Sequence, residues 1–90
     1  NLLEPNNGTF QDTYAWILYK LQQYDEALSW IVKAVENGSG ESPVVLEHYG
    51  DILYMLNRKN EAFEKWEQAK AFGKGSELLE KKIREKKLYE

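Results

Sequence analysis

Apolar residues recur along this chain at spacings of three and four, which is the period of one face of a helix. Short breaks rich in Gln, Asn, Gly or Lys divide the pattern into five segments. We place the predicted helices at residues 9–22, 25–37, 43–57, 60–72 and 76–88. The pattern therefore predicts an all-α protein. Its core is expected to contain the stripes of the first and third helices, which are Tyr14, Ile17, Leu18, Leu21, Tyr49, Ile52, Leu53 and Leu56.

The chain also matches itself when it is shifted by 35 residues. The residues that recur are Tyr14, Ile17, Leu18, Tyr19, Leu21, Glu26, Ala27 and Ala34, which return as Tyr49, Ile52, Leu53, Tyr54, Leu56, Glu61, Ala62 and Ala69. A period of this length is typical of stacked helical repeats, in which neighbouring units share a core. The sequence thus predicts two helix pairs, at 8–41 and 42–75, followed by a capping helix at 76–90.

Small residues stand where the two helices of each pair are expected to touch. The positions concerned, with their larger neighbours, are Ala15, Tyr24, Ala27, Ile31 and Ala34 in the first pair and Gly50, Ala62, Trp66 and Ala69 in the second. On these residues, and on the run Tyr24-Asp25-Glu26-Ala27-Leu28, the chain resembles the tetratricopeptide repeat over residues 8–72. The resemblance implies a right-handed α-α superhelix. Gln22 and Asn57 replace the family's turn glycine, so strain is expected at both turns.

The resemblance also extends to the start of the chain. Residues 1–7 resemble the tail of a preceding repeat, so the chain is expected to be the C-terminal end of a longer array, such as many bacterial proteins carry. The first helix would then present an outward apolar edge that draws on Phe10, Tyr14 and Ile17. Such an edge is expected to cause self-association at high concentration, or to be covered by residues of the tail itself.

In the tetratricopeptide family the first helix of each pair lines a concave groove that binds a segment of a partner protein. The matching positions here are Asp12, Trp16, Tyr19, Lys20, Glu47, His48, Asp51 and Tyr54. The resemblance therefore implies a non-enzymatic interaction scaffold with an acidic and aromatic groove. Because three carboxylates would repel an acidic C-terminal tail, we expect the partner to be a basic or neutral peptide with an apolar anchor.

Composition and charge restrict the alternatives. The 90 residues contain 12 Lys and Arg against 15 Asp and Glu, for a net charge of -3, which argues against nucleic-acid binding. No apolar run approaches the roughly 18 residues of a membrane-spanning helix. Cysteine is absent, so disulfides and thiolate metal sites are excluded and the cellular compartment is left open.

The sequence offers little for catalysis or for a cofactor. His48 is the single histidine, and its neighbour Glu47 points about 100° away around a helix, so a dedicated metal site is not expected. No base is paired with a nucleophile, and the run 73–76 is interpreted as a turn between helices rather than a phosphate loop. The basic residues of the last segment alternate with acidic ones and are expected to form a solvated face; they are Lys81, Lys82, Arg84, Lys86 and Lys87.

Two other functions remain open at this point. The segment could be a purely structural cap that closes a longer superhelix, with partner binding upstream. Alternatively, it could be an accessory module of an enzyme whose catalytic domain lies elsewhere. The sequence names neither the partner nor such a domain.

Overall fold

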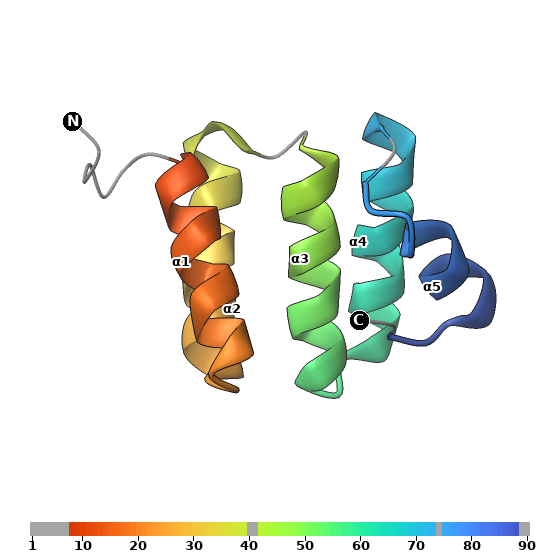
Figure 1. Cartoon of the computed structure of the whole chain (residues 1–90), viewed down its shortest axis with the longest axis horizontal. Helices are drawn as coiled ribbons and strands as arrows, with labels where there is room; N and C mark the ends of the chain where they lie inside the picture. Colours follow the sequence, from red (N-terminus) through yellow and green to blue (C-terminus); the bar gives the residue numbers. More distant parts are fainter. Residues whose placement is uncertain (1–7, 40–41, 74, 89–90) are drawn as a thin grey trace.

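The computed structural model describes residues 8–39, 42–73 and 75–88, and every regular element within these ranges is helical (Figure 1). The helices are α1 (Gly8–Lys20), α2 (Tyr24–Ala34), α3 (Pro43–Met55), α4 (Lys59–Phe72) and α5 (Leu79–Glu85), and a π-helical turn, η1 (Val35–Ser39), extends α2. The predicted all-α class and the five predicted helices are confirmed. α5 is shorter than the expected 76–88, and the proposed tail at 1–7 lies outside the described residues.

Consecutive helices run antiparallel and lie side by side in the order α1, α2, α3 and α4, with α5 at the far end (Figure 1). α1 packs on α2, and α3 packs on both α2 and α4. Ala15 and Ala27 are fully buried in the first pair. In the second pair, a Cβ at Gly50 would lie only 3.0 Å from the carbonyl oxygen of Ala62. Small residues therefore let the paired backbones approach closely.

The two turns that join the helices of each pair have the same geometry. Gln22 and Asn57 are left-handed, with φ of 63° and 64°. The amide of Gln22 donates to the Tyr19 carbonyl at 2.9 Å, and that of the next residue donates to the Leu18 carbonyl at 2.9 Å. The equivalent bonds after α3 are Asn57 N to Tyr54 O at 3.0 Å and Arg58 N to Leu53 O at 2.9 Å. This is the Schellman pattern, and it confirms the expected left-handed strain at two residues other than glycine.

In the connection between the two pairs, the helix ends in a different way. α2 ends through η1, in which Gly38 has a φ of 106°, a conformation that suits glycine. The side-chain amide of Asn37 donates a hydrogen bond to the side-chain oxygen of Gln11 at 3.1 Å. This bond satisfies a polar group that is buried inside the first pair. α3 then begins with the Ser42 hydroxyl accepting from the Val45 amide at 3.4 Å, an N-cap that places Pro43 in the first turn.

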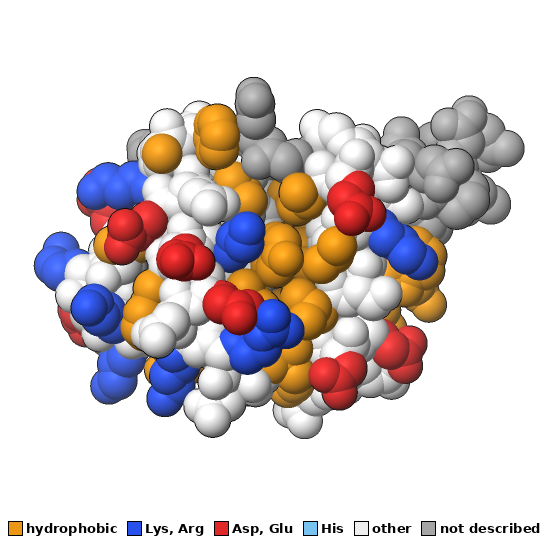
Figure 2. Space-filling view, turned by 180° about the vertical axis from the view of Figure 1, so that it is seen from behind, with side chains coloured by type: hydrophobic (Ala, Val, Ile, Leu, Met, Phe, Trp, Pro, Cys, Tyr) orange, Lys and Arg blue, Asp and Glu red, His pale blue; other side chains and the backbone are white. Residues whose placement is uncertain are grey.

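Buried side chains form two cores that share α3. The first core joins α1, α2 and α3, and it contains Ala15, Leu18, Tyr19, Ala27, Ile31, Ala34, Val45 and Ile52. The second core joins α3, α4 and α5, and it contains Leu46, Trp66, Ala69 and Leu79. On the opposite face of the molecule from that of Figure 1, hydrophobic side chains gather in a band between α2 and α4, with acidic and basic side chains interspersed around it (Figure 2).

The prediction that whole apolar stripes are buried is wrong for α1. Leu18 is buried, but Tyr14, Ile17 and Leu21 are 38%, 50% and 61% exposed. Tyr14 and Ile17 therefore form part of an outward edge, as expected for the first helix from the resemblance. The side chain of Phe10, the third residue expected at this edge, lies outside the described part. Tyr14 keeps an edge-on contact with the Trp30 ring of α2, with ring centroids 4.8 Å apart, so the edge is most open at Ile17 and Leu21.

α4 ends at Gly73, which is not left-handed. Its φ of 169° is extended backbone, and the residue with a left-handed φ, of 62°, is Gly75. Glycine fits at position 73 for a steric reason, because a Cβ there would lie 2.6 Å from Cγ of Pro43. The turn at the start of α3 and the turn at the end of α4 are therefore packed against each other.

Candidate functional site

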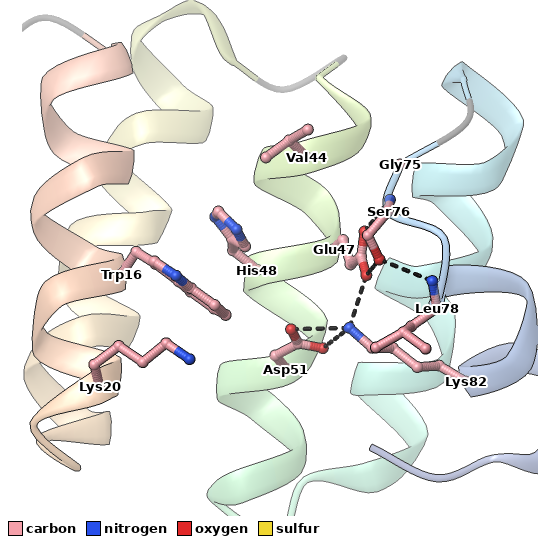
Figure 3. Close-up of a pocket in the computed structure, with 10 residues that line it drawn as sticks. All are labelled: Trp16, Lys20, Val44, Glu47, His48, Asp51, Gly75, Ser76, Leu78 and Lys82. Carbon is pink, nitrogen blue, oxygen red and sulfur yellow. Dashed lines mark hydrogen bonds and ion pairs between the residues drawn. The ribbon is translucent and has the colours of Figure 1, made fainter. Parts of the chain in front are cut away.

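A pocket of about 270 Å³ opens between α1, α3 and the segment that leads into α5 (Figure 3). α1 contributes Trp16 and Lys20, which point toward α3 in this view. α3 is central because it sends side chains to both sides, with His48 toward α1 and the carboxylates of Glu47 and Asp51 toward α5. The complete lining is Trp16, Lys20, Val44, Glu47, His48, Asp51, Gly75, Ser76, Leu78 and Lys82.

An aromatic cluster forms the α1 side of the pocket. The Trp16 indole stacks on the His48 imidazole, with ring centroids 3.9 Å apart and planes inclined by 16°. Trp16 also stacks on Tyr19, at 4.5 Å and 8°. The Lys20 ammonium lies 5.1 Å from the centre of the Trp16 ring, within cation–π range. This side of the pocket is therefore an aromatic stack with a cation at its edge.

The orientation of His48 is fixed by Asp12. His48 Nδ1 lies 2.9 Å from the Asp12 Oδ1 atom, and both side chains are largely buried. An ionised carboxylate can only accept, so the hydrogen of this bond is assigned to Nδ1. Asp12 thus acts on the pocket indirectly, by holding the imidazole against Trp16.

The α5 side of the pocket is a buried ionic cluster of Glu47, Asp51 and Lys82. The Lys82 Nζ atom donates to Glu47 Oε2 at 2.7 Å, to Asp51 Oδ1 at 2.9 Å and to Asp51 Oδ2 at 3.1 Å (Figure 3). The three side chains are only 3% to 5% exposed. Charges removed from water to this extent are stable only when their hydrogen-bonding capacity is used, which three donated bonds achieve for the ammonium.

Further donors complete the cluster. The backbone amide of Ser76 donates to Glu47 Oε1 at 2.7 Å, and the Ser76 hydroxyl donates to Glu47 Oε2. The indole N–H of Trp66 donates to Asp51 Oδ1 at 3.0 Å. The cluster therefore ties the segment before α5, and α5 itself, to α3 and α4.

The two carboxylates titrate differently because their donors differ. Burial raises the pKa of Glu47, but hydrogen bonds from Lys82 and Ser76 outweigh this effect and hold the pKa below its usual value. Burial raises the pKa of Asp51 to about 6, since the attraction of Lys82 offsets only part of the lost hydration and the charge of Glu47 opposes a second anion. When all three groups are ionised, the cluster carries one excess negative charge.

The structure brings most of the expected groove residues to one place. Trp16, Lys20, Glu47, His48 and Asp51 line the pocket, and Asp12 contacts it through His48 as described above. The remaining two residues do not line the pocket, although Tyr19 stacks on Trp16. Tyr19 is buried in the first core, and Tyr54 packs on Trp66, with ring centroids 5.7 Å apart, beside the second core.

The interpretation of the last segment as a solvated basic face is wrong at Lys82, which is 3% exposed. Sequence reasoning also missed Ser76 as a partner of Glu47. The sequence of each helix contains an indication of this buried ionic cluster. Lys82 lies three residues after Leu79 and next to Ile83, on the apolar face of α5, and Glu47 and Asp51 are four residues apart on one face of α3. Two carboxylates on a buried face are stable only when a cation pairs with them.

The cluster does not resemble a metal site. Glu47 and His48 project to opposite sides of α3 (Figure 3), and no three His, Cys, Asp or Glu side chains among the described residues are grouped so as to hold a metal ion. The positive partner of the carboxylates is instead the lysine ammonium. In the same ranges, no helix has the length and apolar character needed to cross a bilayer.

Comparisons with known proteins add no relative: no family model, no curated protein and no solved structure matches the chain.

Proposed function

We propose that this chain is a non-enzymatic protein-interaction module of the tetratricopeptide type. In this proposal, residues 8–41 and 42–75 are two repeats of a right-handed superhelix, which residues 76–90 close, and a partner segment binds between α1 and α3. The repeat period of 35 residues supports it, as do the matching hydrogen bonds of the turns at Gln22 and Asn57. Helices that are offset by one period and end in the same turn are what a stacked repeat requires.

One observation carries the functional part of the proposal. Five residues selected from the sequence as groove positions, which are Trp16, Lys20, Glu47, His48 and Asp51, line one pocket although they come from two helices. Concave sites with apolar walls and a few convergent polar groups are the usual form of binding sites. An apolar cavity of about 150 Å³ binds benzene, so a pocket of about 270 Å³ accommodates one or two side chains of a peptide.

The charges that line the pocket define the partner more closely. The ammonium groups of Lys20 and Lys82 balance the carboxylates of Glu47 and Asp51, and the two carboxylates are directed at Lys82 rather than at the open space between the helices. We therefore propose a neutral peptide with one aromatic or aliphatic anchor against Trp16 as the preferred ligand. A basic peptide gains little, because the acidic groups are already paired, so the dependence of binding on salt is weak.

The test is a titration of neutral, basic and acidic peptides that share one Leu or Trp anchor. Neutral peptides should bind best, and Trp16→Ala should weaken their binding at least tenfold, or about 1.4 kcal/mol, because it removes the stacking surface. Trp30→Ala is the matched control, since Trp30 lies on α2 and is not among the residues of the pocket. It should leave the affinity unchanged.

Two outcomes would refute this proposal. One is a preference for acidic C-terminal tails, since Lys82 already donates to Glu47 and Asp51 and has no hydrogen bond left for a ligand carboxylate. The other is equal binding by Trp16→Ala and wild type when circular dichroism shows both proteins to be folded. In the second case the pocket is not the binding site, and the structural-cap alternative is favoured.

A further inference from the structure

The buried ionic cluster joins two parts of the molecule that are far apart in the sequence. Its carboxylates, Glu47 and Asp51, are on α3, whereas Lys82 is on α5, 35 and 31 residues further along the chain. Trp66 on α4 donates to Asp51 at 3.0 Å and so orients this carboxylate independently of α5. α3 and α4 therefore form a receptor for one cationic side chain, which α5 fills (Figure 3).

Few side chains hold α5 in this receptor. Leu79 and Lys82 are its buried residues, and they lie three positions apart on one face of the helix. Ile83 and Leu88 are only partly buried against the second core. The segment before α5 adds two hydrogen bonds from Ser76. A short helix with so few buried contacts opens at a lower free-energy cost than global unfolding of the chain.

The link between α4 and α5 contains a glycine that suits both a docked and a released α5. Gly75 has a φ of 62°, which glycine adopts without strain. With α5 docked, a Cβ at this position would lie 2.6 Å from Cδ2 of Leu79 and 3.0 Å from Oε1 of Glu47. Glycine therefore lets the link pass over the cluster. Because glycine also populates negative φ, it lets the same link turn away when α5 is released.

The hydrogen-bond donors around the two carboxylates favour a different cation from the one present. The Lys82 ammonium uses all three of its N–H groups here, and the cluster still carries one excess negative charge. Release of α5 would also withdraw the two Ser76 donors from Glu47. A replacement must therefore supply more than three donors. An arginine guanidinium has five, and it pairs with carboxylates in a bidentate manner.

We propose that the surface of α3 and α4 beneath α5 is a docking site for a helix of a partner protein, which displaces α5. This helix carries an aliphatic residue and, three positions later, an arginine that pairs with Glu47 and Asp51, in the spacing of Leu79 and Lys82. α5 is thus an internal competitor, because the partner binds only the fraction of molecules in which α5 is released. The neutral peptide proposed above contacts Trp16 on the α1 side, so either proposal can fail without the other.

The test measures binding of fluorescent peptides to the intact 90-residue chain by anisotropy. The peptides have the sequence of residues 78–88, which excludes Ser76. One peptide is unchanged, and the others carry Lys82→Arg, Lys82→Met or Lys81→Met. The last two have the same net charge, and Lys81 is exposed on α5, so Lys81→Met is the matched control. Changes in the peptide leave the folding of the protein unaffected.

Two variants of the protein alter the release of α5 without changing its receptor. Leu79→Ala weakens the docking of α5 and should raise the fraction of molecules that can bind. The second variant locks α5 in place. Lys70 on α4 and Glu80 on α5 form an exposed ion pair at 3.6 Å, and the chain contains no cysteine. Lys70→Cys and Glu80→Cys can therefore be joined by a short thiol crosslinker, and the same protein without the crosslinker is the control.

The Lys82→Arg peptide should bind more tightly than the unchanged peptide and at least tenfold more tightly than the Lys82→Met peptide, while Lys81→Met should have no effect. Leu79→Ala in the protein should tighten binding at least tenfold, and the crosslink should abolish it. The proposal is wrong if the Lys82→Arg and Lys82→Met peptides bind equally, or if the crosslinked protein binds as well as its control. It is also wrong if sedimentation shows that the chain dimerises by exchange of α5, since the occupant is then a second copy.

Discussion

At the scale of single residues, Gly50 determines how closely α3 approaches α4. A Cβ at this position would clash with the Trp66 indole. In the first helix pair the equivalent residues are Ala15 and Ile31, both fully buried. The larger ring in the second pair thus leaves no room for the methyl group that the first pair contains, which explains why alanine is replaced by glycine.

Gly50→Ala is expected to lower the free energy of unfolding by about 1–3 kcal/mol through overpacking, even though alanine favours a helix over glycine by up to about 1 kcal/mol. In a Trp66→Ile background the clash with the ring is absent and only the 3.0 Å approach to the Ala62 carbonyl oxygen remains, so the same substitution should cost much less. Urea unfolding of the four proteins measures the coupling between the two sites. An equal loss of stability in both backgrounds would contradict this account of the glycine.

Asp51 is expected to make the protein more stable at pH 5 than at pH 7. Its pKa is raised from the ordinary value of 3.8 to about 6 in the folded state. The stabilising contribution of such a group is complete below the ordinary value and is lost as the pH rises through about 6. The part due to Asp51 should therefore increase the free energy of unfolding by about 1 kcal/mol between pH 7 and pH 5.

Chemical unfolding of wild type and Asp51→Asn at both pH values isolates this part, because the other titrating groups are common to the two proteins. The contribution of Glu47 to stability changes with pH in the opposite direction. Its pKa is lowered, so its contribution is lost only as the pH falls below the ordinary value of 4.5. A difference between the two proteins that stays constant from pH 7 to pH 5 would contradict the prediction.

At the scale of elements, one buried cation, Lys82, helps to hold α5 against α3, together with the buried side chain of Leu79. Lys82→Met is expected to lower the free energy of unfolding by about 3–5 kcal/mol, because it leaves Glu47 and Asp51 buried without their counter-ion. Lys81→Met is the matched control, since Lys81 is exposed on the same helix. It should change stability by no more than about 0.5 kcal/mol. Thermal and urea unfolding provide the measurement.

A rescue experiment distinguishes loss of charge pairing from loss of packing. Adding Glu47→Gln and Asp51→Asn to Lys82→Met removes both buried charges, so the triple variant should be more stable than Lys82→Met alone. If the triple variant is less stable, the hydrogen bonds that Ser76 and Trp66 donate to the two carboxylates outweigh the cost of their unpaired charges.

The helices were predictable because their signals are local. Apolar spacing gave the five helices, and the serine and proline at 42–43 gave the start of α3. The burial of Lys82 was not predictable in the same way, because it depends on carboxylates 31 and 35 residues away on another helix. For the site, the shared face of Trp16 and Lys20 followed from helical spacing. The side of α3 that each of its adjacent residues faces could be assigned only once the positions of α1 and α5 were known.

At the scale of the whole molecule, α5 should open more readily than the rest. It contributes Leu79 and Lys82 as its buried residues, whereas α2 and α3 share the larger first core. Hydrogen exchange of the α5 amides should therefore be faster than that of α2. Leu79→Ala should accelerate exchange in α5 without changing α2, whereas Ile31→Ala, which is expected to cost about 2–5 kcal/mol, should accelerate exchange throughout. Uniform exchange across all helices would contradict this view.

The two ends of the molecule also differ in how readily a further helical unit can be added to them. At one end, α1 shows Ile17 and Leu21 to solvent. At the other, the exposed positions of α5 are charged: Glu80, Lys81, Arg84 and Glu85. A tandem duplication in the gene that adds a unit before α1 would convert exposed apolar surface into interface. A unit added after α5 would instead have to strip water from charged groups. Lengthening by duplication is therefore favoured before α1 rather than after α5.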